Sequence, residues 1–121
     1  MTVADGSEIR GETLAEVSNA IVGLFSEYYG RGPTRARSYA FDRYLMTVLE
    51  DCLTTVERTL ANNAREDLVR DVRLTFQEAM AGEFKGAVTR VTGREVLSYH
   101  SQITFDPDVC FELFVLGPAG P

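Results

Sequence analysis

The sequence has few of the residue types that build metal centres and nucleophilic active sites. Among its 121 residues there are no tryptophans, a single histidine (His100) and two cysteines, Cys52 and Cys110. The two cysteines are far apart in apolar surroundings and form no CxxC motif, which is typical of reduced core residues. One histidine and two isolated cysteines do not make a structural zinc site, and we expect neither a bound metal nor a cofactor.

Long apolar runs and an excess of positive charge are also absent. No segment reaches the about 18 consecutive apolar residues of a transmembrane helix, so we expect no direct insertion into a membrane. The formal net charge is -6, from 12 basic and 18 acidic residues. A surface of this sign repels phosphate backbones on average, which argues against nucleic acid as a partner.

The length and the N-terminus bear on domain organisation and location. A chain of 121 residues, 45% of them hydrophobic, can bury one core and leaves no room for a second domain. We therefore expect a single domain over residues 1–121, with loose tails at 1–7 and 117–121. The first residues have neither the basic start nor the apolar stretch of a signal peptide, which predicts a cytoplasmic protein.

The first periodic segment predicts an amphipathic helix. Apolar residues recur at spacings of three and four within 14–28 and form one stripe. Thr13 and Glu16 have the spacing of a capping box, although the helix could also begin near Ser7. Gly30 then provides a residue that accepts the positive φ at which helices end.

Two segments rich in aromatic and β-branched residues predict β-hairpins. In the first strand of the second hairpin, polar and apolar residues alternate, and the core face runs through the odd positions from Leu97 to Phe105. The last strand is apolar apart from Glu112, as expected for a strand in the middle of a sheet. The expected strands and turns are 37–41, Asp42-Arg43, 44–50, 95–105, Asp106-Pro107-Asp108 and 109–116.

Between the hairpins, two further capping-box spacings predict two helices. Thr54 with Glu57 begins a short helix, and Asn63 with Glu66 begins a long one. The long helix is expected over about 64–92. The apolar stripe on one face of it consists of Val69, Val72, Phe76, Met80, Phe84, Val88 and Val91.

This long helix predicts assembly. At about 1.5 Å per residue it would be roughly 43 Å long, more than the diameter of so small a domain. Gly82 and Gly86 lie inside it and mark either a kink or a close helix crossing. Both interpretations suggest that part of the helix packs on another subunit, so we expect a homodimer.

The order of the elements predicts the fold class. We expect an α+β domain of two layers, in which an antiparallel sheet of about four strands, made of two hairpins, packs against the N-terminal helix and the long central helix.

Glycine, proline and arginine concentrate in the segment 30–37, between the first helix and the first strand. Its arginines are Arg31, Arg35 and Arg37. Arg35 and Arg37 could converge on a carboxylate, bicarbonate or phosphate. The alternative is a structural turn whose arginines pair with the acidic surface. The segment lacks the Lys-Ser/Thr ending of a P-loop and follows a helix, so it is not a nucleotide loop.

His100 and Glu112 are the other candidate site residues. We interpret His100 as a strand-surface residue, because a general base needs an orienting partner and a nucleophile close by. Glu112 interrupts an apolar strand, and a buried carboxylate needs a hydrogen-bonded partner or a raised pKa. Its partner is expected to be an arginine of the 30–37 segment or of the long helix, such as Arg73.

Short motifs in three parts of the chain, over about 11–116, carry a family resemblance. They are Ile21-Val22 through Tyr28 with Gly30-Arg31-Gly32-Pro33-Thr34 and Ala36-Arg37; Leu53-Thr54 with Glu57-Arg58-Thr59-Leu60; and Arg73, Phe76-Gln77-Glu78, Val91-Thr92-Gly93, Val96, Ser101, Asp106-Pro107-Asp108 and Glu112-Leu113-Phe114-Val115-Leu116. Together they resemble the family named for MpsC, a small soluble member of a bacterial sodium-translocating, membrane-potential-generating system. Val88-Thr89 and Gln102 depart from it where acidic residues are common, so no acidic role is expected there.

The resemblance implies a soluble accessory partner of membrane proteins linked to sodium or inorganic-carbon uptake, and it supplies no catalytic residues. Our first hypothesis is a cytoplasmic, non-enzymatic, dimeric module that binds a protein partner, such as a membrane complex. The second is a small-anion or metabolite-binding regulatory domain that uses the 30–37 segment. The third is an enzyme using His100, Ser101 and Glu112. The candidate residues for ligand or partner binding are Arg31, Arg35, Arg37, His100 and Glu112.

Overall fold

The structure, a computed structural model, describes residues 9–119 and contains three helices and four strands in these residues. The expected tail at 1–7 lies outside the described residues. The elements in chain order are α1 (Gly11–Tyr29), β1 (Arg35–Phe41), β2 (Tyr44–Glu50), α2 (Thr55–Asn62), α3 (Glu66–Thr92), β3 (Val96–Phe105) and β4 (Asp108–Leu116).

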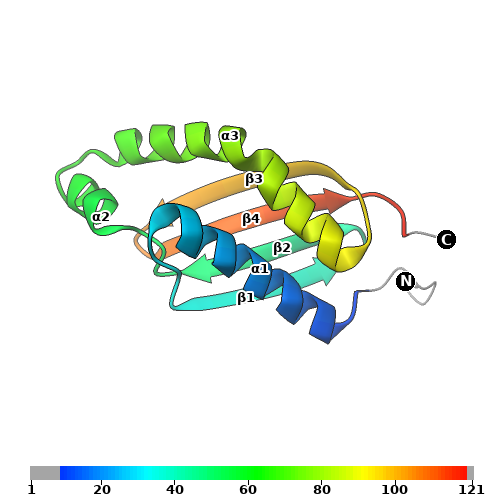
Figure 1. Ribbon diagram of the computed structural model, residues 1–121. Helices are drawn as coiled ribbons and strands as arrows, with labels where there is room; N and C mark the ends of the chain where they lie inside the picture. The colour runs from blue at the N-terminus through cyan, green and yellow to red at the C-terminus, as the bar shows by residue number, and fades with distance from the viewer. Residues whose placement is uncertain (1–8, 120–121) are drawn as a thin grey trace.

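The four strands form one antiparallel sheet in the order β1-β2-β4-β3. Each hairpin contributes one edge strand and one central strand, and the two central strands, β2 and β4, join the hairpins. Figure 1 shows α1 and α3 crossing the same face of this sheet, with α2 near the beginning of α3. The predicted two-layer α+β fold with two hairpins is confirmed, and β4 lies in the middle of the sheet as expected.

The helix starts agree only in part with the predicted capping boxes. Thr54 and Glu57 form the expected box at α2, with each side chain bonded to the other residue's backbone N–H. The other two predictions are wrong. The residues before α1 and α3 are Arg10 and Arg65, and neither makes a side-chain cap. The matching spacing at Thr13 falls inside α1, because the helix begins at Gly11 and Thr13 is already a helical residue, not the N-cap.

The helix ends follow the glycines. Gly30 and Gly93 have φ of 80° and 72° and donate their N–H groups to Ser26 and Thr89, respectively. Residues with a Cβ rarely adopt this left-handed conformation, so glycine ends both helices at little cost.

The core lies between the helices and the inner face of the sheet. Its buried residues come from α1, α3, the strands β2, β3 and β4, and the segment after β2. They are Val17, Ile21, Phe25, Leu45, Leu49, Cys52, Leu53, Val69, Phe84, Val88, Val96, Tyr99, Ile103, Cys110, Phe114 and Leu116. A bulge between Val96 and Ser98 turns Val96 inward and leaves Leu97 49% exposed, so the predicted core face of this strand is wrong at Leu97.

The long helix α3 has 27 residues, or about 40 Å at about 1.5 Å per residue, and bends near the middle of its length (Figure 1). Its predicted stripe is wrong at Val72, which is 55% exposed, because Arg73 takes the core-facing position instead. A Cβ added at Gly82 would meet nothing, and one at Gly86 would meet only Arg90. The bend is therefore observed, and no close helix crossing occurs at these glycines within residues 9–119.

The side of the sheet turned away from the helices, which we call the outer face, carries the alternate residues of each strand. Its members are Arg35, Arg37, Tyr39, Phe41, Tyr44, Met46, Val48, Glu50, Ser98, His100, Gln102, Thr104, Val109, Phe111, Leu113 and Val115. No helix or strand of residues 9–119 covers this face (Figure 1).

Candidate functional site

The most connected polar group of the core is the guanidinium of Arg73 on α3, which is 8% exposed. Its Nε and one terminal nitrogen donate to the two carboxylate oxygens of Glu57 on α2, each at 2.6 Å. The same terminal nitrogen donates to the carbonyl oxygen of Cys52 at 3.0 Å, and the guanidinium lies 4.0 Å from the centroid of the Tyr29 ring. Arg73 thus joins α1, α2, α3 and the segment after β2.

Burial alone would raise the pKa of Glu57, but hydrogen bonds from Arg73 and Thr54 outweigh it and hold this pKa below its usual value. The capping box therefore has two roles, since it starts α2 and also fixes the carboxylate that Arg73 requires. Because each charge is satisfied by its partner, this pair has no free group for a ligand.

The candidate Arg31 contributes to a second ion cluster, at the end of the sheet. One terminal nitrogen donates to the carbonyl oxygen of Leu53 at 2.6 Å and the other donates to Asp51 at 3.1 Å. Arg58 bridges Asp51 and Asp108, at 3.3 and 2.8 Å. Arg31 therefore ties the loop after α1 to the loop after β2.

The candidates Arg35 and Arg37 lie apart from Arg31, on the outer face of the edge strand β1. Both are exposed and, within residues 9–119, neither side chain makes a hydrogen bond or an ion pair. They alternate with Tyr39 and Phe41 on the same face, so the predicted arginine segment divides into a structural residue and two surface residues.

A row of polar side chains crosses the inner face of the sheet, one from each strand. Ser38, Thr47, Glu112 and Ser101 are paired in register across β1, β2, β4 and β3. Hydrogen bonds connect this row to α1. The hydroxyl oxygen of Ser18 lies 2.8 Å from that of Ser38, which in turn lies 2.8 Å from the hydroxyl oxygen of Thr47. We call these residues the polar row. It was not predicted, since single serines and threonines in a strand carry no sequence signal of a shared row.

The candidate Glu112 is fully buried at the centre of this row. The hydroxyl groups of Tyr99 and Ser101 donate to its two oxygens at 2.5 and 2.8 Å. Burial raises the pKa of Glu112 to about 7, although both hydrogen bonds and the charge of Arg73 oppose the rise. The prediction that an arginine pairs with Glu112 is wrong, because Glu57 takes both carboxylate-facing nitrogens of Arg73 and two hydroxyl groups satisfy Glu112.

The candidate His100 is an exposed outer-face residue opposite Leu113, with its Nε2 3.2 Å from the hydroxyl of Ser98. Successive residues of a strand point to opposite faces, so Ser101 points inward to Glu112 while His100 points outward. The set His100, Ser101 and Glu112 is therefore not assembled as one catalytic site.

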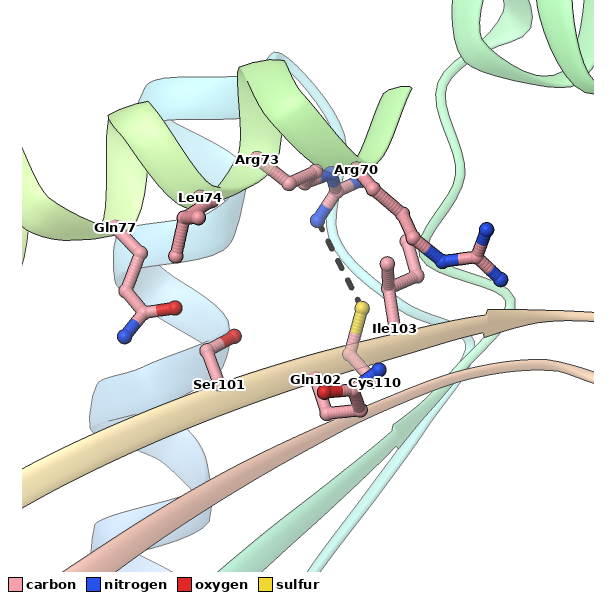
Figure 2. Close-up of a pocket in the computed structure, with 8 residues that line it drawn as sticks. All are labelled: Arg70, Arg73, Leu74, Gln77, Ser101, Gln102, Ile103 and Cys110. Atoms are coloured by element: carbon pink, nitrogen blue, oxygen red, sulfur yellow. Dashed lines mark hydrogen bonds between the residues drawn. The ribbon is translucent and has the colours of Figure 1, made fainter. Parts of the chain in front are cut away.

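A cleft of about 160 Å³ opens between α3 and β3 (Figure 2). In Figure 2, Leu74 and Gln77 reach from α3 toward the sheet, Ser101 points up from β3, and Arg73 approaches Cys110. Within residues 9–119, Gln77 makes no hydrogen bond, and Arg70 at the rim only stacks on Phe105, at 4.8 Å from the ring centroid. The cleft lining is Arg70, Arg73, Leu74, Gln77, Ser101, Gln102, Ile103 and Cys110.

Cys110 forms part of the cleft floor, and Cys52 is its neighbour in the core. Both are free and buried, as predicted. The hydrogen bond between Cys110 and Cys52 and the burial of Cys110 raise the pKa of the Cys110 thiol, so this thiol is a weak nucleophile at neutral pH.

The fold and these contacts define a small two-layer α+β protein whose polar core groups bond mainly to one another. Residues 9–117 match the family described as MpsC, Na+-translocating membrane potential-generating system. The chain therefore belongs to the MpsC family, and the resemblance inferred from its motifs is confirmed. No curated protein and no solved structure matches the chain in the corresponding comparisons.

Residues 9–119 contain neither a membrane-spanning helix nor a cluster of metal-ligating side chains. None of the helices there combines the length and the apolar character needed to cross a bilayer. In the same residues, no group of three or more histidine, cysteine and acidic side chains is arranged to hold a metal ion.

Replacing Arg73 with methionine is expected to lower the free energy of unfolding by about 3–5 kcal/mol, because Glu57 then remains buried without its partner. Urea denaturation at pH 7 measures the loss. Adding Glu57→Leu should recover part of it, since no carboxylate is then buried. Arg70→Met, one turn earlier and exposed, is the control and should cost less than about 1 kcal/mol. Equal losses in the two single variants would contradict the role of the pair.

The raised pKa of Glu112 predicts that stability falls as pH rises. Between about 4.5 and about 7 the folded chain keeps the Glu112 proton, whereas the unfolded chain has released it, so rising pH favours unfolding. The expected decrease is up to about 3 kcal/mol over this interval, with no further effect of this group above it. Urea titrations at several pH values should show this slope in the wild type and a smaller one in Glu112→Gln. Parallel pH profiles would exclude the predicted titration.

Proposed function

We propose that this protein is a cytoplasmic, non-enzymatic accessory protein that acts as a homodimer and binds a protein component of a membrane system for sodium or inorganic-carbon uptake. Membership of the MpsC family supports the link to such a system, because its description refers to Na+ translocation and membrane potential. The non-enzymatic part is supported by the separation of His100 from Ser101 and Glu112.

The observation that carries the proposal is the exposure of apolar side chains on two separate surfaces. One is the outer face, and the other lies on α2 and the first half of α3. The second surface exposes Val56 by 69%, Val72 by 55% and Leu68 by 36%. Contiguous exposed apolar side chains mark interaction sites, so two such surfaces fit one assembly contact and one partner contact. We assign the α2–α3 surface to the partner protein.

Co-purification tests this assignment. Tagged wild-type chain, expressed in its natural host, is expected to bring down one membrane protein after mild detergent extraction. Val72→Glu should reduce its recovery at least about 10-fold, because a charge at an exposed apolar contact costs more than about 1.4 kcal/mol. Ala15→Glu, an equal charge change at an exposed position of α1, should leave recovery unchanged. Recovery that is the same for all three chains would show non-specific capture.

A second candidate function is the binding of a small anion in the cleft between α3 and β3. It is favoured by Gln77 and Arg70, whose donors are free of hydrogen-bond partners within residues 9–119. The apolar wall of Leu74 and Ile103 would accommodate the hydrocarbon part of a small carboxylate, while the Ser101 hydroxyl already donates its hydrogen to Glu112. The 30–37 segment supports this function less, because Arg31 is bonded to Asp51 and Leu53.

A thermal-shift titration with acetate, phosphate and bicarbonate tests this candidate. Binding with a millimolar dissociation constant should raise the midpoint at concentrations well above that constant, by linkage of ligand binding to folding. Gln77→Ala and Arg70→Ala should lose the shift, whereas Arg90→Ala on the same helix should keep it. A shift shared by all variants would indicate a general salt effect.

A further inference from the structure

The outer face is apolar at its centre and polar at its edges. The central strands β2 and β4 contribute an unbroken apolar block, and its members are Tyr44, Met46, Val48, Val109, Phe111, Leu113 and Val115. The edge strand β1 adds Arg37 and Tyr39, and the edge strand β3 adds His100 and Gln102. An apolar centre with a polar rim is the usual anatomy of a protein interface.

This block is exposed in the single chain. Phe41 is 68% exposed, Tyr39 51% and Tyr44 43%, and the central residues between them are partly exposed. Antiparallel sheets with one solvated face normally alternate apolar and polar residues, so that the solvated face is polar. Here both faces of β2 and β4 are mainly apolar, apart from Thr47 and Glu112 in the middle of the inner face and Glu50 at the end of the outer face, which is the pattern of strands covered on both sides.

We propose that a second copy of this chain covers the outer face, so that two sheets pack face to face around a two-fold axis that runs between them, parallel to the strands. The inference rests on the homodimer of the proposed function and names its contact. It places the dimer contact on the sheet, whereas the length of α3 had suggested the helix.

The side chains of the two edges complement each other in this arrangement. Rotation about this axis leaves the position along the strands unchanged and exchanges the two edges of the sheet. As a result, β1 of one copy lies over β3 of the second copy. Arg37 then faces Gln102 of the second copy, and Tyr39 faces His100 of the second copy, because each pair shares one row of the register. The side chain of Arg37 makes no hydrogen bond within residues 9–119, and the amide oxygen of Gln102 in the second copy supplies an acceptor.

The charge distribution favours a second copy at this face. The protein carries a net charge of -6, so most of its faces repel a like chain. On the outer face, Glu50 is the one carboxylate, and Arg35 lies beside it in register. The exposed side of α3 instead carries Asp67, Asp71 and Glu78, which would oppose their own copies.

The size of the face is consistent with a stable dimer. Four strands at about 4.8 Å spacing and seven paired residues at about 3.3 Å give a flat area of roughly 450 Å². This flat area is a little more than half of the about 800 Å² per partner of a standard interface, and the protruding aromatic and aliphatic side chains add to it. Aligned sheets pack in this way at about 10 Å separation.

Light scattering after gel filtration tests the contact. The wild-type chain is expected to be a dimer at micromolar concentration. Met46→Lys, at the centre of the outer face, should raise the dimer dissociation constant at least about 30-fold, because it buries an unpaired charge. Leu74→Lys, the same kind of change on α3, should leave the dimer intact. A monomeric wild type, or dissociation by Leu74→Lys alone, would overturn the proposal.

Cross-linking tests the axis and does not depend on Met46→Lys folding correctly. Tyr39→Cys and His100→Cys replace exposed residues at opposite edges of one sheet, about 14 Å apart at about 4.8 Å per strand. A short bismaleimide should join the two variants when they are mixed and should join neither variant with itself, because the axis pairs position 39 with position 100. Self-cross-linking of either variant, or no cross-linking of the mixture, would refute this geometry.

Other occupants of the face give different results. A wild-type monomer that binds vesicles of anionic phospholipid, and loses this binding in Met46→Lys, would overturn the proposal in favour of a lipid surface. A wild-type monomer that still brings down its membrane protein would remove the dimer and keep the accessory role. These results therefore distinguish a failure of the proposed dimer contact from a failure of the proposed accessory role.

Discussion

The buried guanidinium of Arg73 is the contact on which the helical layer depends. A sheet and two crossing helices could bury the same apolar area in several arrangements, but Arg73 has one set of partners. They are Glu57, the carbonyl group of Cys52, the sulfur of Cys110 and the ring of Tyr29. Since a buried ion pair is costly unless every group is satisfied, the three helices are held where these bonds form together. The capping box of α2 is part of this constraint, because Thr54 orients the carboxylate that Arg73 binds.

The two faces of the sheet separate stability from recognition. Polar groups of the inner face bond to one another, and within residues 9–119 no buried side-chain nitrogen or oxygen lacks a partner. The outer face has the opposite character, with apolar side chains exposed at its centre. A protein of the MpsC family with this division is suited to assembly, since its core leaves little free chemistry and its surface leaves unburied apolar area.

The sequence predicted the elements better than the contacts between them. Strand alternation, the Asp42-Arg43 turn and the two terminal glycines gave the hairpins and the helix ends, because these signals are local. Arg73 was missed as the partner of Glu57, although its position in the stripe of α3, four residues after Val69, was a usable signal. The polar row could not be predicted, because it depends on the register of four strands, and two-residue shifts preserve every alternation pattern.

Because a two-residue shift preserves the alternation of every strand, the polar row contributes to the specificity of folding. A slip of β4 by two residues would keep Cys110, Glu112 and Phe114 on the inner face, so burial of apolar area alone discriminates poorly between the two alignments. Only the native alignment places Glu112 opposite Ser101, with Tyr99 also within reach. A slip that places Glu112 opposite Ile103 would move the carboxyl group away from both donors, at a cost of several kcal/mol for a buried group without them. The polar row therefore favours the native strand register over shifted registers that bury a similar apolar area.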